Sequence, residues 1–486
     1  MTIRVLILSA SVGSGHKVAA AAVEQAFRSR PGVEVLNQDA LKLTSRLYQV
    51  AATDAYFALV KENPWAVGWL YDQNDEPFKH EAGLMQLVNL LNAQPLTRFI
   101  QDYDPDITVC THFMPAALVA QLLSQGRLHT ALAIITTDYD FQGMWLSRAF
   151  NRYFVAQEEA KVQLSALGIA PERITVSGIP VGLDFSEPVD APAIRARFQL
   201  DAAIPTLLVS AGAFGGGPAS EIVAQILRMQ TPVQTVVVCG RNRLLRDEVT
   251  ALTAAHADRF RVLGFTNEMH DLMRVATLFV GKPGGLTSAE CMAAGLPMLI
   301  VNPIPGQEER NSDLLLENGV AARSNSLLSI GYKLDGLLSE PGRIAAMRAA
   351  TARLGRPDAA RVVVETLLSD DLAPYTISRA EQRQIIAVAR GDSEPALPEP
   401  QLVDTVALFN DETGVYLGEI SPAQLQFLID NLEEEGPHDV TYYLDGPTID
   451  FLAAQGADAE LLSLLWDALG QHGNLELRYL KPEAAA

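Results

Sequence analysis

The chain has 486 residues, too many for one hydrophobic core, so two or three domains are expected. Hydrophobic residues make up 48% and charged residues 20%, a composition typical of a soluble globular protein, and no apolar run reaches the roughly 18 residues of a membrane-spanning helix. The net charge of −21 argues against nucleic-acid binding, which needs a basic surface.

The first predicted elements are a buried strand over residues 4–11 and a helix over residues 18–27, joined by the turn GSGHK. A glycine turn at such a junction directs backbone N–H groups and the positive end of the helix dipole at one spot, which makes it a candidate anion site. The turn completes neither nucleotide-binding fingerprint, because Val18 replaces the third glycine and no Ser or Thr follows Gly-Lys. The dipole keeps His16 neutral, so His16 is either a general base or a helix cap.

Two further features bear on the compartment. The first strand runs into GSGH rather than into a small-residue cleavage site, so we expect a strand and not a signal peptide. The three cysteines, Cys110, Cys239 and Cys291, lie far apart and form no CxxC motif, so neither a disulfide framework nor a zinc site is indicated. Both features favour the cytoplasm.

An aromatic patch follows between residues 48 and 78, with seven aromatic residues that include Trp65, Trp69 and Tyr71. It is either helical core or an amphipathic surface that contacts a bilayer or an apolar substrate.

Strand-like runs then alternate with helical patterns to about residue 370. The runs lie near residues 6, 108, 134, 208, 237, 279 and 300. Repeated βα units imply parallel sheets with both faces covered. The stretch 185–205 carries three prolines and no clean strand, so we interpret it as the connection between two α/β domains.

Several loops of the second α/β domain have the composition of a nucleotide-sugar site. SAGAFGGGP (210–218) and KPGG (282–285) follow strands and let backbone approach a phosphate, and Arg241 follows the strand between them. Thr287 and Glu290 share one face of the next helix, where an acid can bind both ribose hydroxyls. Because the carboxyl ends of parallel strands meet at one edge, we expect these loops to converge on one crevice.

The amino-acid composition of the chain changes near residue 390. GDSEPALPEPQ is typical of a flexible linker, and beyond it a hairpin, a helix capped by Ser421 and two more strands predict a small α+β module. From Tyr375 onward there are 20 acidic residues and 5 Lys or Arg, a net charge of −15. We expect a role in interaction or regulation, with a basic protein as a partner.

Five motifs together resemble one family. GSGH, VCTHFMPAALVA, GFTNEM, KPGGLTSAE and NPIPGQEERN are similar to motifs of GT-B glycosyltransferases, in particular the monogalactosyldiacylglycerol synthases and the processive diacylglycerol glucosyltransferases. The resemblance covers about residues 3–370. It implies an α/β fold with an acceptor domain (1–184) and a UDP-sugar donor domain (200–372), and it leaves the acidic module (400–482) outside.

The resemblance also implies residue roles. The uracil is expected to contact Gly264, Phe265, Thr266 and Met269. The ribose is expected to contact Glu290. The hexose is expected to contact Gln307 and Glu308. The diphosphate is expected to contact Gly212, Gly215, Gly216, Arg241, Gly284, Gly285 and Thr287. On the acceptor side, His16 is the expected base, with Asp138 or His112 as a helper, and Trp65, Trp69 and Tyr71 are expected to dock the lipid.

One position departs from the family pattern. The stretch IITTDYDFQGMWL resembles a motif TDxxxHxxW, but Gln142 stands at the histidine position, while Asp138 and Trp145 remain. The same stretch contains Asp138-Tyr139-Asp140, a triplet that binds a divalent metal in another glycosyltransferase fold. In GT-B enzymes helix N-termini and cations stabilise the departing UDP instead, so we expect no cofactor and no obligatory metal.

The resemblance therefore predicts an inverting transfer of glucose or galactose from a UDP-sugar to diacylglycerol or a glycosyl-diacylglycerol. The expected location is cytoplasmic and peripheral, at the inner membrane face. Three alternatives stay open at this point: a UDP-GlcNAc transferase acting on a polyprenol-linked peptidoglycan precursor, a UDP-sugar epimerase, and a UDP-sugar sensor. An NAD-dependent oxidoreductase is the least favoured.

Overall fold

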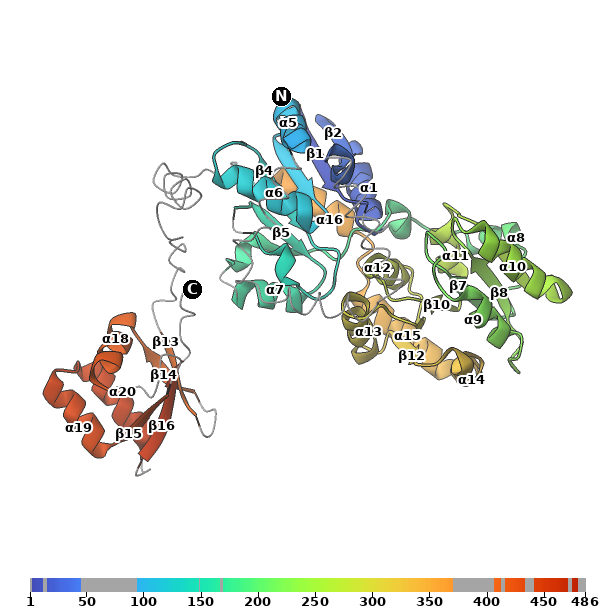
Figure 1. Cartoon of the computed structure of the whole chain (residues 1–486). Coiled ribbons are helices and arrows are strands. Elements are labelled where there is room, and N and C mark those ends of the chain that lie inside the picture. The colour runs from blue at the N-terminus through green and yellow to red at the C-terminus, as the bar shows by residue number, and fades with distance from the viewer. Residues whose placement is uncertain are drawn as a thin grey trace. The chain divides into compact units, whose positions relative to one another are not determined.

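The computed structural model describes residues 2–11, 15–44, 94–147, 149–166, 169–369, 406–411, 416–432, 441–470 and 474–479. The chain forms two compact units, Met1–Gln382 and Arg383–Ala486, and each is described by itself. The larger unit contains two six-stranded parallel sheets and the smaller one a four-stranded antiparallel sheet (Figure 1). The predicted class, two α/β halves and a small α+β module, is confirmed.

The first half is built on a sheet in which every neighbouring pair of strands is parallel. Across the sheet the strands are β2 (Val33–Asp39), β1 (Ile3–Ser9), β3 (Ile107–Cys110), β4 (Ala131–Ile135), β5 (Arg152–Val155) and β6 (Ile174–Val176). The described helices between them are α1 (Gly15–Arg28), α5 (Gln94–Tyr103), α6 (Phe113–Ser124) and α7 (Glu158–Ala166). Side chains alternate along β1, so Leu6 and Leu8 pack in one core cluster and Val5 and Ile7 in another, on the opposite face.

The second half repeats this plan. Across its sheet the strands are β12 (Ala321–Ser324), β11 (Met298–Val301), β10 (Leu278–Gly281), β7 (Thr206–Ser210), β8 (Gln234–Val238) and β9 (Phe260–Leu263), all parallel. The helices are α8 (Ala191–Arg197), α9 (Ala219–Ile226), α10 (Arg243–Thr253), α11 (Met269–Val275), α12 (Gly285–Ala293), α13 (Gln307–Glu317), α14 (Ile330–Leu338) and α15 (Pro341–Leu354). Two buried clusters again cover the two faces of the sheet.

Short 3₁₀ segments complete this unit. They are η1 (Ala40–Leu43), η2 (Gly143–Trp145), η3 (Pro171–Arg173), η4 (Leu183–Ser186), η5 (Ala254–His256) and η6 (Leu327–Ser329). The stretch 185–205, predicted as a connection, contains the helix α8. This helix forms because the carboxylate of Asp190 caps it, accepting a hydrogen bond from the Ala193 N–H at 3.0 Å.

The strand order reverses once in each sheet, between β1 and β3 and between β7 and β10. In doubly wound sheets, ligands bind outside the carboxyl ends of the strands at such a reversal, because the connecting helices diverge to opposite faces there. His16 follows β1, His112 follows β3, and the loops that begin at Gly212 and Lys282 follow β7 and β10. Some of the predicted site residues therefore lie at the two reversal points, and the others follow the strands beside them.

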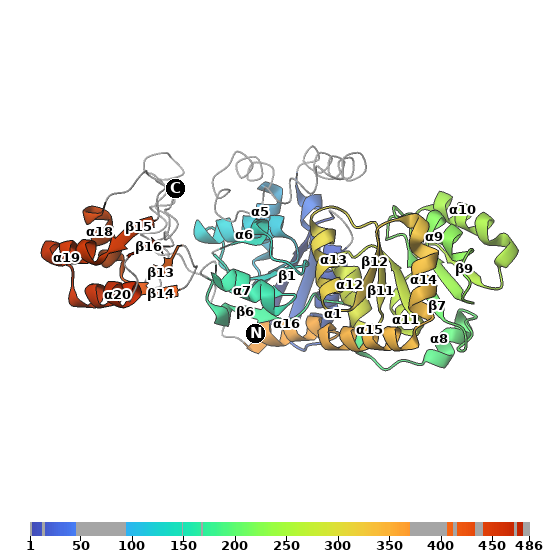
Figure 2. The ribbon, with the colours of Figure 1, turned by 90° about the horizontal axis from the view of Figure 1, so that it is seen from below.

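The last helix of the larger unit returns to the first half. α16 (Ala359–Ser369) follows α15 of the second half in sequence, but lies beside α1 (Figure 2). Its buried residues Val363, Val364 and Leu367 share a core cluster with Val5 and Ile7 of β1. The two halves are thus joined by an apolar contact as well as by the chain that links them.

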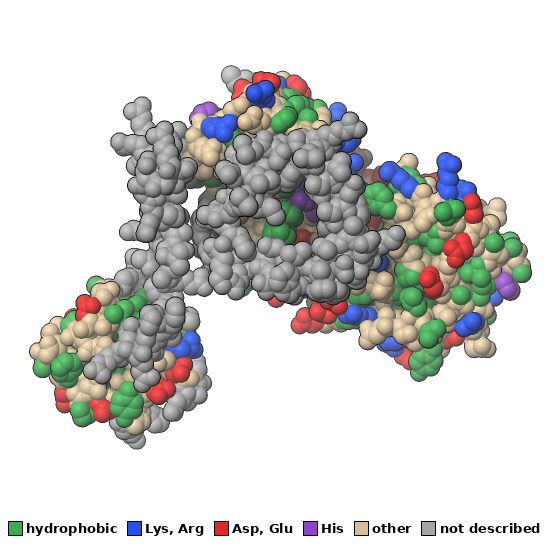
Figure 3. All heavy atoms as spheres, in the orientation of Figure 1, with side chains coloured by type: hydrophobic (Ala, Val, Ile, Leu, Met, Phe, Trp, Pro, Cys, Tyr) green, Lys and Arg blue, Asp and Glu red, His purple; other side chains and the backbone are tan. Residues whose placement is uncertain are grey.

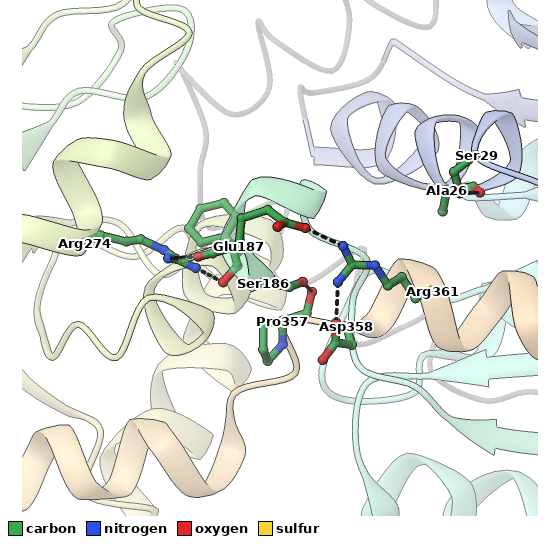
Figure 4. A network of polar contacts seen from close by, with 9 residues as sticks. Ala26, Ser29, Ser186, Glu187, Arg274, Pro357, Asp358 and Arg361 are labelled. Atoms are coloured by element: carbon green, nitrogen blue, oxygen red, sulfur yellow. Dashed lines mark hydrogen bonds and ion pairs between the residues drawn. The ribbon is translucent and has the colours of Figure 1, made fainter. Parts of the chain in front are cut away.

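The chain segment that links the halves makes polar contacts to both (Figure 4). Arg274 of α11 donates hydrogen bonds to the carbonyl oxygens of Phe185 and Glu187. The Glu187 carboxylate pairs with Arg361 of α16 at 2.7 Å, and Arg361 also pairs with Asp358 at 2.8 Å. The ion pairs are largely solvent-exposed, so each contributes only about 0–1 kcal/mol, and the apolar packing of α16 contributes more.

The two halves also meet where α12 begins. A Cβ atom on Gly285 would overlap the carbonyl oxygen of Thr137, in the loop after β4. Only glycine, which has no Cβ, allows backbone to approach backbone this closely.

The smaller unit has strands in the order β14 (Tyr416–Ile420), β13 (Val406–Asn410), β16 (Asn474–Tyr479) and β15 (Thr441–Asp445). Its helices are α18 (Pro422–Asn431), α19 (Gly446–Gln455) and α20 (Ala459–Leu469). One face of the sheet packs on the helices, since Tyr442 and Leu444 are buried while Tyr443 between them is 56% exposed. Hydrophobic and acidic side chains are interspersed on the face of this unit seen in Figure 3.

We predict that Gly285→Ala destabilises the larger unit by about 1–3 kcal/mol, because the new methyl group must push the Thr137 peptide away. The matched control is Gly336→Ala in α14, where no atom lies within 4 Å of the new Cβ and the helix gains up to about 1 kcal/mol. The measurement is urea denaturation of both variants. Equal stabilities would show that the halves do not touch at Gly285.

Candidate functional site

His16 lies in the first turn of α1 and contacts residues that follow the next two strands of the sheet. Its Nδ1 lies 2.9 Å from the carbonyl oxygen of Thr111 and 2.8 Å from the hydroxyl oxygen of Thr137. The Thr111 hydroxyl also donates a hydrogen bond to the His16 carbonyl at 2.9 Å. Thr111 follows β3 and Thr137 follows β4, so three adjacent strand ends determine where the imidazole lies.

These contacts determine the tautomer of His16. A carbonyl oxygen only accepts, so Nδ1 carries the proton and donates it to Thr111, and the neutral ring keeps its lone pair on Nε2. Burial lowers the pKa of His16 to about 4, and the hydrogen bond to the Thr111 carbonyl opposes this shift. At neutral pH the imidazole is therefore uncharged and can accept a proton at Nε2.

His112 is a helix cap. Its Nδ1 accepts a hydrogen bond from the Met114 N–H at 3.1 Å, at the start of α6. Its ring lies edge-on to His16, with ring centroids 4.5 Å apart, and 4.3 Å from the ring of Phe113. Burial lowers the pKa of His112 well below its usual value, so His112 is neutral as well.

Asp138 contacts Trp145, whose ring faces both histidines. Its Oδ2 accepts a hydrogen bond from the indole Nε1–H of Trp145 at 3.3 Å, and the Trp145 ring centroid is 6.4 Å from that of His16. Burial raises the pKa of Asp138 to about 7, with the Trp145 hydrogen bond opposing the shift and the charge of Asp140 adding to it. The three predicted acceptor-side residues, His16, His112 and Asp138, thus lie together.

Helix α13 of the second half contacts the same segment. Gln307 Nε2 donates a hydrogen bond to Asp138 Oδ1, and Arg310 forms an ion pair with Asp140 at 2.5 Å. The buried Asn311 donates to the Pro283 carbonyl at 3.1 Å and accepts a long hydrogen bond from the Tyr139 N–H at 3.5 Å. Because residues 307, 310 and 311 share one helix face, α13 binds consecutive residues of the first half.

The glycine loop after β7 packs against the loop after β8. A Cβ atom on Gly215 (φ +70°) would overlap Asn242, and one on Gly240 (φ +60°) would overlap the carbonyl oxygen of Gly212. Asn242 holds the two loops together, since its Nδ2 donates to the Gly215 carbonyl at 3.0 Å. Gly212 and Gly216 have no atom within 4 Å of a Cβ position, so the loop leaves open space beside them.

The predicted uracil residues lie at the neighbouring strand end. The exposed guanidinium of Arg241 lies 4.9 Å from the ring centroid of Phe265, which is 52% exposed. Thr266 accepts a hydrogen bond from the Glu268 N–H at 3.0 Å, which shapes the turn into α11. Gly264 approaches the backbone of the loop after β8, and Met269, the first residue of α11, packs partly buried against the core.

The start of α12 carries the remaining donor-side residues. Gly284 precedes the helix, and Glu308 Oε1 lies 3.8 Å from where its Cβ would be. Glu308 accepts a hydrogen bond from the Ile304 N–H at 2.7 Å; burial raises its pKa, and Lys282 and this hydrogen bond oppose the shift. The carboxylate of Glu308 therefore lies near the positive end of the α12 dipole.

Thr287 and Glu290 are one turn apart on α12, and both are half-buried. Burial raises the pKa of Glu290 from 4.5 to about 7. Within the described residues no hydrogen bond or ion pair engages the Glu290 side chain. The carboxylate of Glu290 is thus partly exposed and has a raised pKa, which makes it a candidate for contact with a ligand.

Gln142, which stands where the family motif has histidine, caps η2. Its Oε1 accepts a hydrogen bond from the Met144 N–H at 2.9 Å, and the residue is buried. A histidine Nδ1 can serve as the same acceptor, as His112 does, so the substitution retains a local structural role.

Several predictions concern residues outside those that the structure describes. Gly13 and Ser14 of GSGH are among them, and so are Trp65, Trp69 and Tyr71. Asp138 and Asp140 of the DxD triplet bind α13 instead of converging on one point. In the described part of the chain, no three acidic, histidine or cysteine residues cluster as metal ligands, and no helix is long and apolar enough to span a bilayer.

Five residues of the site were not identified from the sequence: Thr111, Thr137, Asn242, Arg310 and Asn311. Thr137 directly precedes Asp138 at the end of a strand, the position that marked the other candidates. Arg310 and Asn311 lie one turn after Gln307, so helical spacing would have placed them on the same face.

Two protein families match the chain in succession. Residues 16–181 match "Monogalactosyldiacylglycerol (MGDG) synthase", and residues 219–354 match "Glycosyl transferases group 1". The first match includes His16 and Asp138, and the second includes Glu290 and Gln307. Neither of these two matches extends to the smaller unit.

The chain is also similar to individual proteins of related description. The chain is 28% identical over 376 residues to a processive diacylglycerol beta-glucosyltransferase of Bacillus cereus (strain AH187), covering 76% of this chain and 94% of the relative. A relative of the same description from Bacillus anthracis (strain CDC 684 / NRRL 3495) matches equally. The crystal structure of Acinetobacter baumannii MurG superposes with a TM-score of 0.51 at 17% identity, over 76% of this chain and all of that chain. This last likeness concerns the fold alone, and it supports the GT-B arrangement.

We predict that His112→Ala is about 1 kcal/mol less stable than His112→Asn, because asparagine still accepts the Met114 N–H and alanine leaves it unpaired. The measurement is the free energy of unfolding of both variants in urea. Equal values would mean that the cap does not stabilise α6.

We predict that Glu290→Gln stabilises the protein at about pH 8 and that the gain disappears near pH 5. The raised pKa means that folding takes up a proton between about pH 4.5 and 7, so the wild type loses stability as the pH rises through this range. Thermal melting at both pH values measures the gain, with Glu159→Gln on the exposed surface of α7 as the control. A gain that is the same at both pH values would contradict the burial of this carboxyl.

Proposed function

We propose that this chain, a GT-B glycosyltransferase related to the monogalactosyldiacylglycerol synthases and the processive diacylglycerol glucosyltransferases, moves glucose or galactose from a UDP-sugar to diacylglycerol or a glycosyl-diacylglycerol. The observation that carries the proposal is the protonation state of the two ring nitrogens of His16. Its Nδ1–H is bound to a backbone carbonyl, so its Nε2 is a proton acceptor next to the donor half. The acceptor and the two hexoses are those in the names of the relatives and of the first family, and UDP as the carrier is inferred from the sequence motifs of the second half.

In the proposed reaction His16 Nε2 takes the proton of the acceptor hydroxyl while the hydroxyl oxygen attacks the anomeric carbon. The bond between that carbon and the diphosphate oxygen breaks, and UDP leaves with the electron pair. Attack from the face opposite UDP inverts an α-linked donor to a β-glycoside. The imidazolium then releases its proton to solvent.

His16 is a weak base in the free protein, and binding of the donor is expected to raise its pKa. With a pKa of about 4, Nε2 is unprotonated at any neutral pH. The negative diphosphate of the bound donor lies close by in the proposed complex and stabilises the imidazolium, so the base strengthens when the donor is present.

The donor-side roles follow the geometry of the second half. The open glycine loop with Gly212 and Gly216, the N-terminus of α12 and Arg241 are the proposed diphosphate contacts. Glu290 is the proposed ribose contact, and Gln307 and Glu308 are the proposed hexose contacts. The helix dipole and the Arg241 cation stabilise the leaving UDP in this proposal, and no metal is required.

The acceptor is apolar, so we propose that the protein works at the cytoplasmic face of a membrane, with Trp65, Trp69 and Tyr71 contacting the lipid. The net charge of −15 beyond residue 374 is repelled by anionic lipids. A basic protein partner for the acidic module is consistent with this charge.

The test is UDP release by the purified full chain, with diacylglycerol in mixed micelles and a panel of UDP-sugars. We expect release that depends on the lipid with UDP-glucose or UDP-galactose. His16→Ala is expected to lower kcat by about 10²–10⁴-fold, because it removes the base. Glu290→Ala is expected to weaken UDP binding in calorimetry, because it removes the ribose contact.

Other outcomes would identify other functions. Sugar isomers formed from the UDP-sugar alone would indicate an epimerase, and release only with a polyprenol-linked acceptor would indicate the peptidoglycan-precursor reaction. UDP binding without release with any acceptor would indicate a sensor. Full activity in His16→Ala would overturn the assignment of the base.

A further inference from the structure

We infer that the hydroxyl of Thr137 is a positioning group for His16, which holds the imidazole so that Nε2 faces the acceptor hydroxyl. The inference rests on the proposed function, because it takes His16 as the base.

The geometry around His16 Nδ1 carries the inference. The Thr111 carbonyl lies 2.9 Å from this nitrogen and the Thr137 hydroxyl oxygen 2.8 Å from it. Since the carbonyl requires Nδ1 to be the donor, the Thr137 oxygen accepts the second branch of the same N–H. One acceptor lets the ring turn about the hydrogen bond, whereas two acceptors on different strand ends determine its plane.

Burial strengthens the two hydrogen bonds of His16 Nδ1. Thr111 is fully buried and Thr137 is nearly so. Little water competes for the Nδ1 proton there, and hydrogen bonds are stronger where the dielectric is low. Thr137 provides the side-chain contact to this ring nitrogen, while Thr111 contributes its backbone oxygen.

The same contact has a role during the reaction. When Nε2 takes the proton of the acceptor, the positive charge of the imidazolium spreads to Nδ1–H, and both oxygens stabilise it. They occupy the place that a carboxylate has in a Ser-His-Asp triad, but they carry no charge. Neutral acceptors raise the pKa of the ring less than a carboxylate at that position would.

Thr137 also connects the base with the donor half. Its carbonyl oxygen lies against Gly285 at the start of α12, and the next residue, Asp138, accepts the hydrogen bond from Gln307. The residue that orients the base is therefore the residue on which the donor half packs. The correct alignment of Nε2 requires the two halves to be in this contact.

The decisive variant is Thr137→Val, which keeps the shape of the side chain and removes the acceptor oxygen. We expect kcat to fall about 10-fold, as for the loss of a hydrogen bond to a charged group, with the KM for the UDP-sugar and the melting temperature nearly unchanged. Thr137→Ser keeps the oxygen and is expected to restore most of kcat. The control is Thr136→Val, since the Thr136 hydroxyl contacts the Phe154 carbonyl at 3.5 Å and not His16.

A second measurement does not depend on turnover. In ¹⁵N-histidine-labelled protein, the His16 signals, identified by their loss in His16→Gln, are expected to show a protonated Nδ1. The Nδ1 signal should shift and its proton exchange faster in Thr137→Val, and remain in place in Thr136→Val.

The two assays separate the inference from the proposed function. Unchanged kcat together with unchanged His16 signals in Thr137→Val would overturn the inference. A wild type that releases no UDP with any lipid, but whose His16 signals still depend on Thr137, would overturn the proposed reaction and support Thr137 as the group that holds the ring.

Discussion

The site depends on the contact between the loop after β4 and the helices α12 and α13. Thr137 lies against Gly285, Asp138 binds Gln307, and Asp140 pairs with Arg310. Through Thr137 the same loop holds the imidazole of His16. Residues 137–140 of one loop therefore bring His16, the proposed base, and the proposed donor-side residues of the second half into one place. A change in this contact alters both parts of the site.

Burial gives the site its electrostatic character. It lowers the pKa of His16 to about 4 and raises those of Asp138 and Glu290 to about 7, in each case because a charged form is poorly solvated there. Such a site destabilises the free protein, but charges that arrive with a ligand interact strongly in it. Glu290, which is half-buried and has a raised pKa, is therefore a candidate for such an interaction.

The architecture could be predicted from the sequence to a large extent. Seven apolar runs were assigned as strands, and they are β1, β3, β4, β7, β8, β10 and β11. Strands such as β6, with three residues, produce no distinct run. The apolar residues of α16 indicate that this helix is buried, but local pattern does not specify the partner. That α16 returns to the first sheet follows from packing between segments more than 300 residues apart in the chain.

The sequence by itself determined which residues lie at the ends of the strands, because glycine turns and polar residues after apolar runs are local features. These features, together with the resemblance to the family motifs, made five residues the candidates for the site: His16, His112, Asp138, Glu290 and Gln307. Only the tertiary structure decided which nitrogen of His16 is free, because that depends on a carbonyl and a hydroxyl from strands distant in sequence. It also decided why residue 285 is glycine, because the atom that excludes a side chain there belongs to Thr137 of the other half.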